Sequence, residues 1–270
     1  MPAVSVIMGV YNGAKQPFLD RAIQSILHQT VQDLELIVCD DGSQDGTWPL
    51  LCAYREADRR IKLLRSPVNC GLAAALNRCL PVAEGRYIAR QDADDRSRTD
   101  RLAVQLEFLE QHPEIGFAGS GILLYDASGY WGRRSFPQYP EEQDFLFTVP
   151  FSHGALMVRR EAYQRVGGYR VARETRRAED YDLLMRLYAQ GVRGANLPDF
   201  LYDYLEDEAA EKRRRYLYRI DEAVVRWKGF SALGLLPAGL PYVAKPLVVG
   251  LLPAGLLRWL RYHRTIEKIR

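Results

Sequence analysis

The sequence is poor in cysteine, and its cysteines lack the spacing of a metal site. Cys39, Cys52, Cys70 and Cys79 form no CxxC pair and have no nearby histidine at ligand spacing. A zinc site and a disulfide framework are therefore not expected, and a reducing compartment is favoured. The first residues also lack a basic segment followed by a long apolar run, so we expect no signal peptide and a location on the cytoplasmic side.

Several common motifs of nucleotide-binding and hydrolytic enzymes are missing as well. The sequence has no GxGxxG, GxxxxGK[ST], HExxH or GxSxG motif, which argues against simple dehydrogenases, P-loop enzymes, zincins and α/β-hydrolases. The net charge of +3 over 270 residues is too small to indicate a nucleic-acid partner. That charge is uneven, because residues 206–270 carry a net +6 and the rest of the chain a net −3.

Short apolar runs alternate with amphipathic helical patterns in the first 95 residues. Helical spacing covers residues 18–27, 47–57 and 72–83. The apolar runs that predict strands are Val4–Met8, Leu34–Cys39, Ile61–Leu64 and Tyr87–Ala89. This alternation predicts an α/β fold with a mostly parallel, Rossmann-like sheet flanked by helices.

The second half of the chain has a less regular pattern. After a helix near residues 99–111, the apolar pieces become shorter and are interrupted by glycine and proline, at residues 116–119, 122–125 and 155–158. A helix is then predicted over Glu179–Tyr188, with Gly191 just beyond its end. We expect this irregular half to form the acceptor side of a binding site.

Three polar clusters follow predicted parallel strands, where α/β proteins bind ligands. They are Tyr11-Asn12, Asp40-Asp41 and Asp92–Asp95. The carboxylates of Asp92–Asp95 could bind a hard divalent cation, or could form an acidic loop that caps the next helix. Asp40-Asp41-Gly42 is typical of a tight turn, and a carboxylate there could also accept a hydrogen bond from a nucleobase.

Two further positions allow a structural or a functional interpretation. Glu179 and Asp180 at a helix start could simply complement the helix dipole, or one of them could act as a general base. His153 by itself is more often a structural residue than a catalytic one.

A series of motifs then runs through residues 3–200 in a fixed order. They are VSVIMGVYN (4–12), SILHQT (25–30), LIVCDDGSQDGT (36–47), NCGL (69–72), AALN (74–77), GRYIAR (85–90), DADD (92–95), HGALMVRR (153–160), VGGY (166–169) and EDYDL (179–183). This series resembles that of family 2 glycosyltransferases. The resemblance implies a GT-A fold, a nucleotide-sugar donor such as a UDP-, dTDP- or GDP-sugar, a divalent cation (Mn²⁺ or Mg²⁺) and inversion at the anomeric carbon.

The resemblance also implies roles for the clusters named above. Asp94 would be the metal ligand and Asp180 the general base. The implied nucleotide-binding residues are Val10, Tyr11, Asn12, Asp40, Asp41 and Asp92. The implied residues on the acceptor or donor-sugar side are Asp95, His153 and Glu179.

One part of the family pattern is missing. Many relatives carry a Tyr-Arg-x-His motif after the helix of the general base, whereas residues 201–207 here contain no histidine. No role for that histidine is therefore carried over. Two alternative functions are a sugar nucleotidyltransferase, which would need a glycine-rich loop with a basic residue near the first strand, and a catalytically silent binding module at the membrane.

The chain divides by composition into a GT-A domain (1–205, with halves 1–95 and 96–205) and a basic, hydrophobic tail (206–270). Residues 229–257 contain a single charge, Lys245, but four prolines interrupt them. Basic residues flank this segment on both sides, which favours an arm that dips into the inner leaflet over one that crosses it. The alternative is an arm packed on the domain or on a second subunit. We expect a role in cell-envelope polysaccharide or lipid-linked glycan assembly, at the membrane's inner face.

Overall fold

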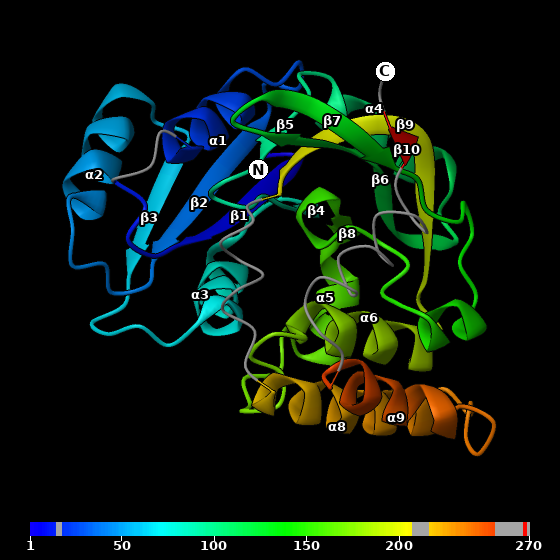
Figure 1. Cartoon of the computed structure of the whole chain (residues 1–270). Coiled ribbons are helices and arrows are strands. Elements are labelled where there is room, and N and C mark those ends of the chain that lie inside the picture. Colours follow the sequence, from blue (N-terminus) through cyan, green and yellow to red (C-terminus); the bar gives the residue numbers. More distant parts are fainter. Residues whose placement is uncertain (15–17, 207–215, 252–266, 269–270) are drawn as a thin grey trace.

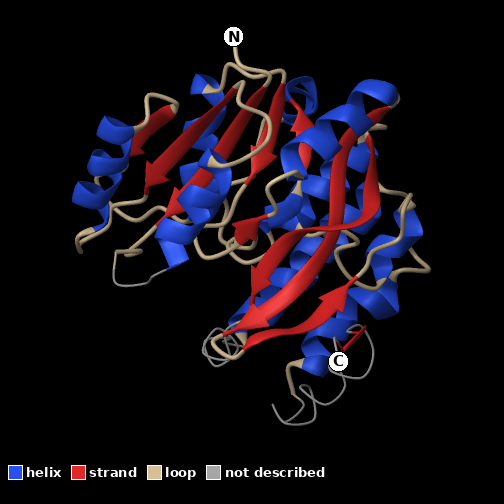
Figure 2. Ribbon diagram, turned by 90° about the horizontal axis from the view of Figure 1, so that it is seen from above, coloured by secondary structure: helices blue, strands red, loops and turns tan. Residues whose placement is uncertain are grey.

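The computed structural model describes residues 1–14, 18–206, 216–251 and 267–268. A curled mixed sheet of ten strands runs through the domain, with helices on both of its faces (Figures 1 and 2). The strand order is β10-β7-β6-β8-β4-β1-β2-β3, and β9 pairs with both β6 and β5.

The first half contains four parallel strands. The strands of this half are β1 (Val4–Val10), β2 (Leu34–Asp40), β3 (Ile61–Arg65), β4 (Tyr87–Arg90) and the short β5 (Arg96–Ser97). Its helices are α1 (Phe18–Leu27), α2 (Thr47–Ala57), α3 (Leu72–Cys79) and the 3₁₀ turn η1 (Leu80–Val82). β1 pairs in parallel with β2 and β4, and β2 pairs in parallel with β3. The predicted α/β arrangement is confirmed.

Strand β1 is apolar throughout because helices cover both of its faces. Val6 and Met8 pack in the cluster that contains Ile23 of α1, while the intervening Ile7 packs in the cluster that contains Leu76 of α3. Alternate side chains of a strand point to opposite faces, so a strand covered on both sides needs a continuous apolar run.

The second half contains longer and mostly antiparallel strands. Its strands are β6 (Ile115–Asp126), β7 (Gly129–Arg134), β8 (Met157–Arg159), β9 (Arg193–Leu205) and β10 (Glu267–Lys268). Its helices are α4 (Arg101–Gln111), η2 (Glu142–Leu146), η3 (His153–Ala155), α5 (Arg160–Val166) and α6 (Glu179–Ala189). β8 pairs antiparallel with β4 and β6, which joins this half to the parallel strands. β9 runs parallel to β6.

The expectation of short apolar pieces in this half was wrong for β6, which is one strand of 12 residues. Its glycines do not interrupt the strand; they lie where neighbouring segments approach closely. A Cβ atom at Gly116 would lie 2.2 Å from Val192, and one at Gly119 would lie 2.4 Å from Asn196. These glycines are required by long-range packing, which the local pattern does not contain.

The described part of the tail forms a helical hairpin against α6. It consists of α8 (Leu217–Ala232) and α9 (Leu240–Val249), which lie side by side along the edge of the domain in Figure 1. Val225 and Phe230 of α8 are buried in the same core cluster as Leu184 of α6. No helix in the described ranges combines the length and apolar character needed to cross a bilayer. The charged sequence over residues 206–228 predicts a helix, of which the structure describes α8 from Leu217 onward. Residues 207–215 of that stretch, and residues 252–257 of the apolar segment, lie outside the described ranges.

Candidate active site

The polar clusters that follow β1 and β2 are linked by hydrogen bonds. The backbone N–H of Asn12 donates to Ser43 Oγ at 2.9 Å, and Asn12 Oδ1 accepts from the N–H of Gln44 at 2.9 Å. Asn12 has a φ of 52°, in the left-handed region that asparagine tolerates better than most residues. Val10 is buried in the strand, and the Tyr11 side chain beside it is exposed, so the ring of Tyr11 is available to a ligand.

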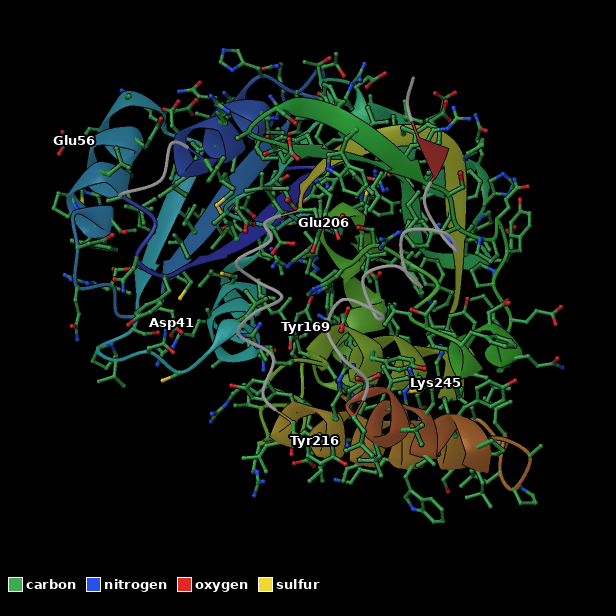
Figure 3. The ribbon with its side chains drawn as sticks, viewed as in Figure 1. Asp41, Glu56, Tyr169, Glu206, Tyr216 and Lys245 are labelled. Atoms are coloured by element: carbon green, nitrogen blue, oxygen red, sulfur yellow. The ribbon has the colours of Figure 1, made fainter. Side chains whose placement is uncertain are left out.

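Asp40 and Asp41 are both buried and form part of the wall of this edge. Asp40 Oδ1 accepts from the N–H of Ser43 at 3.0 Å, as expected for a tight turn, and Oδ2 lies 3.3 Å from Nε of Arg65. Asp41 is 3% exposed, and its carboxylate accepts from the N–H groups of Cys70 and Gly71 at 3.0 and 2.7 Å. Figure 3 shows Asp41 beyond the end of β2, next to α3. Asp41 therefore fixes the start of α3, and a nucleobase contact would use its remaining lone pairs.

The acidic motif at the end of β4 is held by charged and backbone partners. Asp92 Oδ1 lies 2.5 Å from Nη2 of Arg90, whose side chain is fully buried. Tyr125 of β6 donates its hydroxyl to the backbone carbonyl of Asp94 at 3.0 Å. Asp95 is 1% exposed, and its Oδ1 accepts from the N–H of Leu205 at 2.7 Å. The motif is thus attached to β6 and β9.

The electrostatics of this motif fit a bound cation. Burial, together with the charges of Asp92 and Asp94, raises the pKa of Asp95 well above its usual range, and Asp95 Oδ2 has no hydrogen-bond partner. The described residues contain no group of three histidine, cysteine, aspartate or glutamate side chains placed to hold a metal on their own. Mg²⁺ and Mn²⁺ commonly bind through one or two carboxylates plus substrate phosphates, so Asp92 and Asp94 suit an open site of this kind.

Glu179 and Asp180 lie in the first turn of α6. The helix is anchored because Leu183, Leu184 and Leu187 are fully buried. Burial and the neighbouring Asp180 charge raise the pKa of Glu179 to about 8. Burial likewise raises the pKa of Asp180 to about 6, and the Asp92 charge acts in the same direction. Both carboxyl groups are therefore within electrostatic reach of the acidic motif, although they come from the other half of the chain.

Asp180 has the properties of a general base. Its Oδ1 accepts the N–H of Tyr181 at 2.7 Å, which leaves Oδ2 to receive a proton. A carboxyl group with a pKa near 6 is mostly ionised at neutral pH and is more basic than an ordinary aspartate. Glu179 Oε2 is buried without a hydrogen-bond partner among the residues that the structure describes.

A chain of hydrogen bonds connects α3, η3, α5 and the segment between α5 and α6. His153 Nε2 and the Tyr169 hydroxyl are 2.8 Å apart, and the Tyr169 and Tyr163 hydroxyls are 3.0 Å apart. Burial and the charge of Arg90 lower the pKa of His153 to about 3, so the imidazole is neutral. Asn77 of α3 bonds both the N–H and the carbonyl of Tyr169, and Figure 3 shows Tyr169 between α3 and the α5–α6 layer. His153 thus belongs to a neutral network that connects the two halves.

Three residues of the site had no role assigned from sequence. Arg90 neutralises Asp92, Tyr169 links the halves, and Tyr202 accepts the N–H of Asp92 at 3.1 Å through its hydroxyl. Arg90 and Tyr169 stand within the motifs GRYIAR and VGGY, so their position was visible in the sequence. Their function was not, because it depends on burial in the case of Arg90 and on Asn77, 92 residues away in the chain, in the case of Tyr169.

Comparison with known proteins places this arrangement in context. The family model described as "Glycosyl transferase family 2" matches residues 5–167, and a second, "Glycosyl transferase family group 2", matches residues 87–266. The chain is 44% identical to EpsE of Bacillus subtilis (strain 168) over 97% of this chain and 94% of that protein. EpsE is named as a glycosyltransferase. It is 29% identical to the Escherichia coli UDP-Glc:alpha-D-GlcNAc-diphosphoundecaprenol beta-1,3-glucosyltransferase WfaP, over 75% of this chain and 77% of that protein.

Two solved structures share the fold. TarS of S. aureus in complex with UDP-GlcNAc has a TM-score of 0.70 at 18% identity, covering 97% of this chain and 79% of that one. A mannosyltransferase of Pyrobaculum calidifontis in complex with GDP-Man and Mn²⁺ has a TM-score of 0.61 at 23% identity, covering 97% of this chain and 79% of that one. The GT-A fold expected from the sequence motifs is confirmed.

Proposed function

Since this chain belongs to glycosyl transferase family 2 and is a glycosyltransferase, we propose that it moves a sugar from a nucleotide-sugar donor to an acceptor hydroxyl with inversion at the anomeric carbon. The observation that carries the proposal is that buried acidic groups from the two halves of the chain lie near enough to affect each other's protonation. Burial chiefly, and in addition the charge of Asp92 at the end of β4, raises the pKa of Asp180 at the start of α6. An inverting transfer needs this arrangement, with a site for the departing diphosphate on one side and a base on the other.

The nucleoside would bind at the carboxyl ends of β1 and β2. Tyr11 is exposed there, Asn12 is held in its unusual conformation, and Asp41 organises the residues before α3. UDP, UDP-GlcNAc and GDP-Man occupy structures with the same fold, which supports a nucleotide-sugar donor. Asp40 would act indirectly, because it is fully buried in the turn.

The diphosphate would lie beside the acidic motif. Asp94, with Asp92, would hold a divalent cation (Mn²⁺ or Mg²⁺), which when bound offsets the negative charge of the phosphates. Asp92 is already paired with Arg90. Tyr125 and Tyr202 hold the motif by backbone contacts. A direct sugar contact by Asp95 stays a prediction, and it would require the loop to shift, since Asp95 is buried against β9.

On the acceptor side, Asp180 would remove the proton of the attacking hydroxyl. The hydroxyl oxygen forms its bond to the anomeric carbon as the bond from that carbon to the diphosphate breaks on the opposite face, and the proton passes to Asp180. Glu179 would donate or accept a hydrogen bond to a hydroxyl of the donor or acceptor sugar. The neutral network of His153 and Tyr169 would hold α6 and the acidic motif in fixed positions relative to each other.

We further propose that the acceptor is a glycan or a lipid-linked glycan of the cell envelope, and that the enzyme works at the inner face of the membrane through its C-terminal tail. WfaP acts, by its name, on a diphosphoundecaprenol-linked sugar. The tail is rich in both basic and apolar residues. Its hairpin of α8 and α9 covers α6, the helix that carries the proposed base.

A panel of nucleotide sugars tests the proposal. Each donor is incubated with the full chain, with and without Mn²⁺, and the release of nucleoside diphosphate is measured with and without membrane lipid extract as a source of acceptor. The proposal expects release from one class of donor that depends on the metal and increases with the extract. A nucleotidyltransferase would instead release pyrophosphate from a nucleoside triphosphate and a sugar phosphate, and a silent module would release nothing from any donor.

A further inference from the structure

The hairpin of α8 and α9 presents an apolar surface to solvent on the side turned away from α6. Trp227 is 52% exposed and Val248 is 60% exposed, although both stand in helices packed against the domain. We define the α8–α9 face by its exposed apolar side chains: Tyr216, Leu217, Ile220, Val224, Trp227, Leu240, Val248 and Leu251. On α8 they recur every three or four residues, so they form one continuous stripe.

This face is hollowed between the two helices. A groove of about 540 Å³ runs along it and is lined by Tyr216, Ile220, Ala223, Val224, Trp227, Val243 and Leu247. Figure 3 shows Tyr216 at one end of α8 and Lys245 on α9. Large exposed apolar patches of this kind mark binding surfaces in soluble proteins.

The charges around the α8–α9 face are predominantly positive. Helix α9 has no acidic residue. The acidic side chains of α8 and of the neighbouring loop are all paired with basic ones: Asp221 with Arg173 at 3.7 Å, Glu222 with Arg226 at 3.1 Å, and Glu174 with Lys228 at 2.6 Å. Among the described residues of α8, α9 and the neighbouring loop, no acid is therefore left unpaired to oppose the approach of an anionic surface.

A second basic element comes from the catalytic domain and not from the tail. Residues 170–177, the arginine loop, contain four arginines and one glutamate. The loop lies against α8, since Arg177 stacks over the ring of Tyr218 with 5.4 Å between the guanidinium carbon and the ring centroid. Thr175 is buried and fixes the loop by donating to the Arg170 carbonyl at 2.7 Å. Arg176 and Arg177 are exposed, and neither has an acidic partner among the residues that the structure describes.

We propose that the α8–α9 face and the arginine loop together form a docking surface for a bilayer that contains anionic phospholipids. The inference deepens the proposed function, on which it rests for the location at a membrane. The apolar stripe would enter the boundary between headgroups and acyl chains, where tryptophan and tyrosine are favoured. The loop arginines would bind lipid phosphates, which attract each nearby cation.

The charge pattern favours a membrane over a second copy of the chain. In a symmetric dimer the same patch meets itself, so the arginine loops of two copies would face each other across or beside the contact. Such like charges repel, whereas an anionic lipid surface complements them. The loop also ends directly before α6, with Arg177 two residues from Glu179. Docking would therefore place the active site next to the membrane, where a lipid-linked acceptor is found.

The test is binding of the full chain to lipid vesicles, measured by co-sedimentation at several salt concentrations. Vesicles of phosphatidylglycerol should bind the chain more tightly than vesicles of phosphatidylcholine, and added salt should weaken only the former. The double variant Arg176→Gln/Arg177→Gln should bind phosphatidylglycerol roughly 30-fold more weakly, about fivefold for each cation lost. Trp227→Gln/Val248→Gln should weaken binding to both kinds of vesicle, because it reduces the apolar contact.

Two matched controls keep the test specific. Arg55→Gln/Arg59→Gln removes the same charge from exposed positions at α2, whose place is marked by Glu56 in Figure 3, far from the hairpin. Tyr139→Gln removes an apolar side chain that is 54% exposed outside the α8–α9 face. Both should bind like the unchanged protein, and thermal unfolding should show that all variants fold.

Equal binding of the arginine-loop variant and its control would overturn the proposal. The proposal would also be overturned if the unchanged chain did not bind vesicles but formed a dimer in light scattering, and if Trp227→Gln/Val248→Gln disrupted that dimer. Metal-dependent release of nucleoside diphosphate from the donor panel is measured separately in solution. If that release fails while vesicle binding behaves as expected, the proposed function is wrong and the docking surface stands.

Discussion

Replacing Asp180 by asparagine should nearly abolish transfer while making the folded chain more stable. Asparagine keeps the shape of the side chain and the oxygen that accepts the N–H of Tyr181, and removes only the charge and the ability to take a proton. General-base catalysis contributes typically about 10²- to 10⁴-fold. The turnover number should fall by that factor, and the affinity for the nucleoside diphosphate should change little, because the base acts on the acceptor.

The gain in stability follows from the raised pKa of Asp180. Its pKa is about 6 in the folded chain, against an ordinary value of 3.8, so the folded state disfavours the ionised form. The penalty is complete above pH 6 and disappears as the pH falls towards 4. The shift sets an upper limit of about 3 kcal/mol at neutral pH. Solvent screening of the partly exposed carboxylate reduces the expected gain to on the order of 1 kcal/mol.

Two measurements on the same protein preparations check this prediction. Initial rates of acceptor-dependent diphosphate release give the loss of turnover, and urea unfolding at pH 7.5 and pH 4.5 gives the change in stability. The gain should be full at the higher pH and should fall to about a third of that value at the lower one, because pH 4.5 still lies above the ordinary pKa of 3.8. Glu161→Gln, an exposed acid in the first turn of α5, should change neither quantity. Transfer at the wild-type rate would refute the role as base, and a loss of stability together with activity would show that Asp180 is a structural residue.

Other consequences can be tested in the same way. Asp94→Ala should remove Mn²⁺-dependent binding of the nucleoside diphosphate in calorimetric titration; a titration that the substitution leaves unchanged would contradict the metal-binding role. Tyr169→Phe removes the hydroxyl that His153 contacts and should lower stability by about 1 kcal/mol in urea unfolding, with reduced turnover; an unchanged turnover number would contradict the linking role. Gly154→Ala would place a Cβ 2.4 Å from the Tyr202 hydroxyl and should weaken donor binding; unaltered affinity would contradict the tight packing. The wild-type rate should rise as the pH increases through about 6, as Asp180 ionises, and a flat profile would exclude that base.

The sequence by itself determined the elements of the parallel half and the place of the site. Helix α2 spans Thr47–Ala57 as the apolar spacing predicted, and α6 begins at Glu179 as its acidic first turn indicated. These features depend on local periodicity and on residues at helix ends, which are visible in a short window of sequence. The meeting of the polar clusters after β1 and β2 was also predictable, because parallel strands bring their carboxyl ends to one edge.

Only the tertiary structure decided which acids are exposed and which are buried. Asp41 and Asp95 resemble ligands in the sequence, yet each is used mainly to hold backbone N–H groups from a distant segment. Arg90 differs in that its partner Asp92 is only two residues away, but its burial, which makes the pairing strong, is likewise set by the tertiary structure. A carboxylate's function depends on what surrounds it, and those neighbours come from residues far apart in the chain.

In the C-terminal hairpin, too, some features could be predicted from the sequence and others depend on the tertiary structure. Composition predicted an apolar and basic tail with broken helices, because proline and charge are local properties. Composition did not indicate which side of α8 would be buried. Phe230 lies in the core and Trp227, three residues earlier, lies on the surface, since α6 covers only one side of the helix. The packing of the chain determines which side of α8 stays uncovered and that this side lies beside the arginine loop. Such contacts join segments that are distant in the sequence, so a local pattern does not contain them.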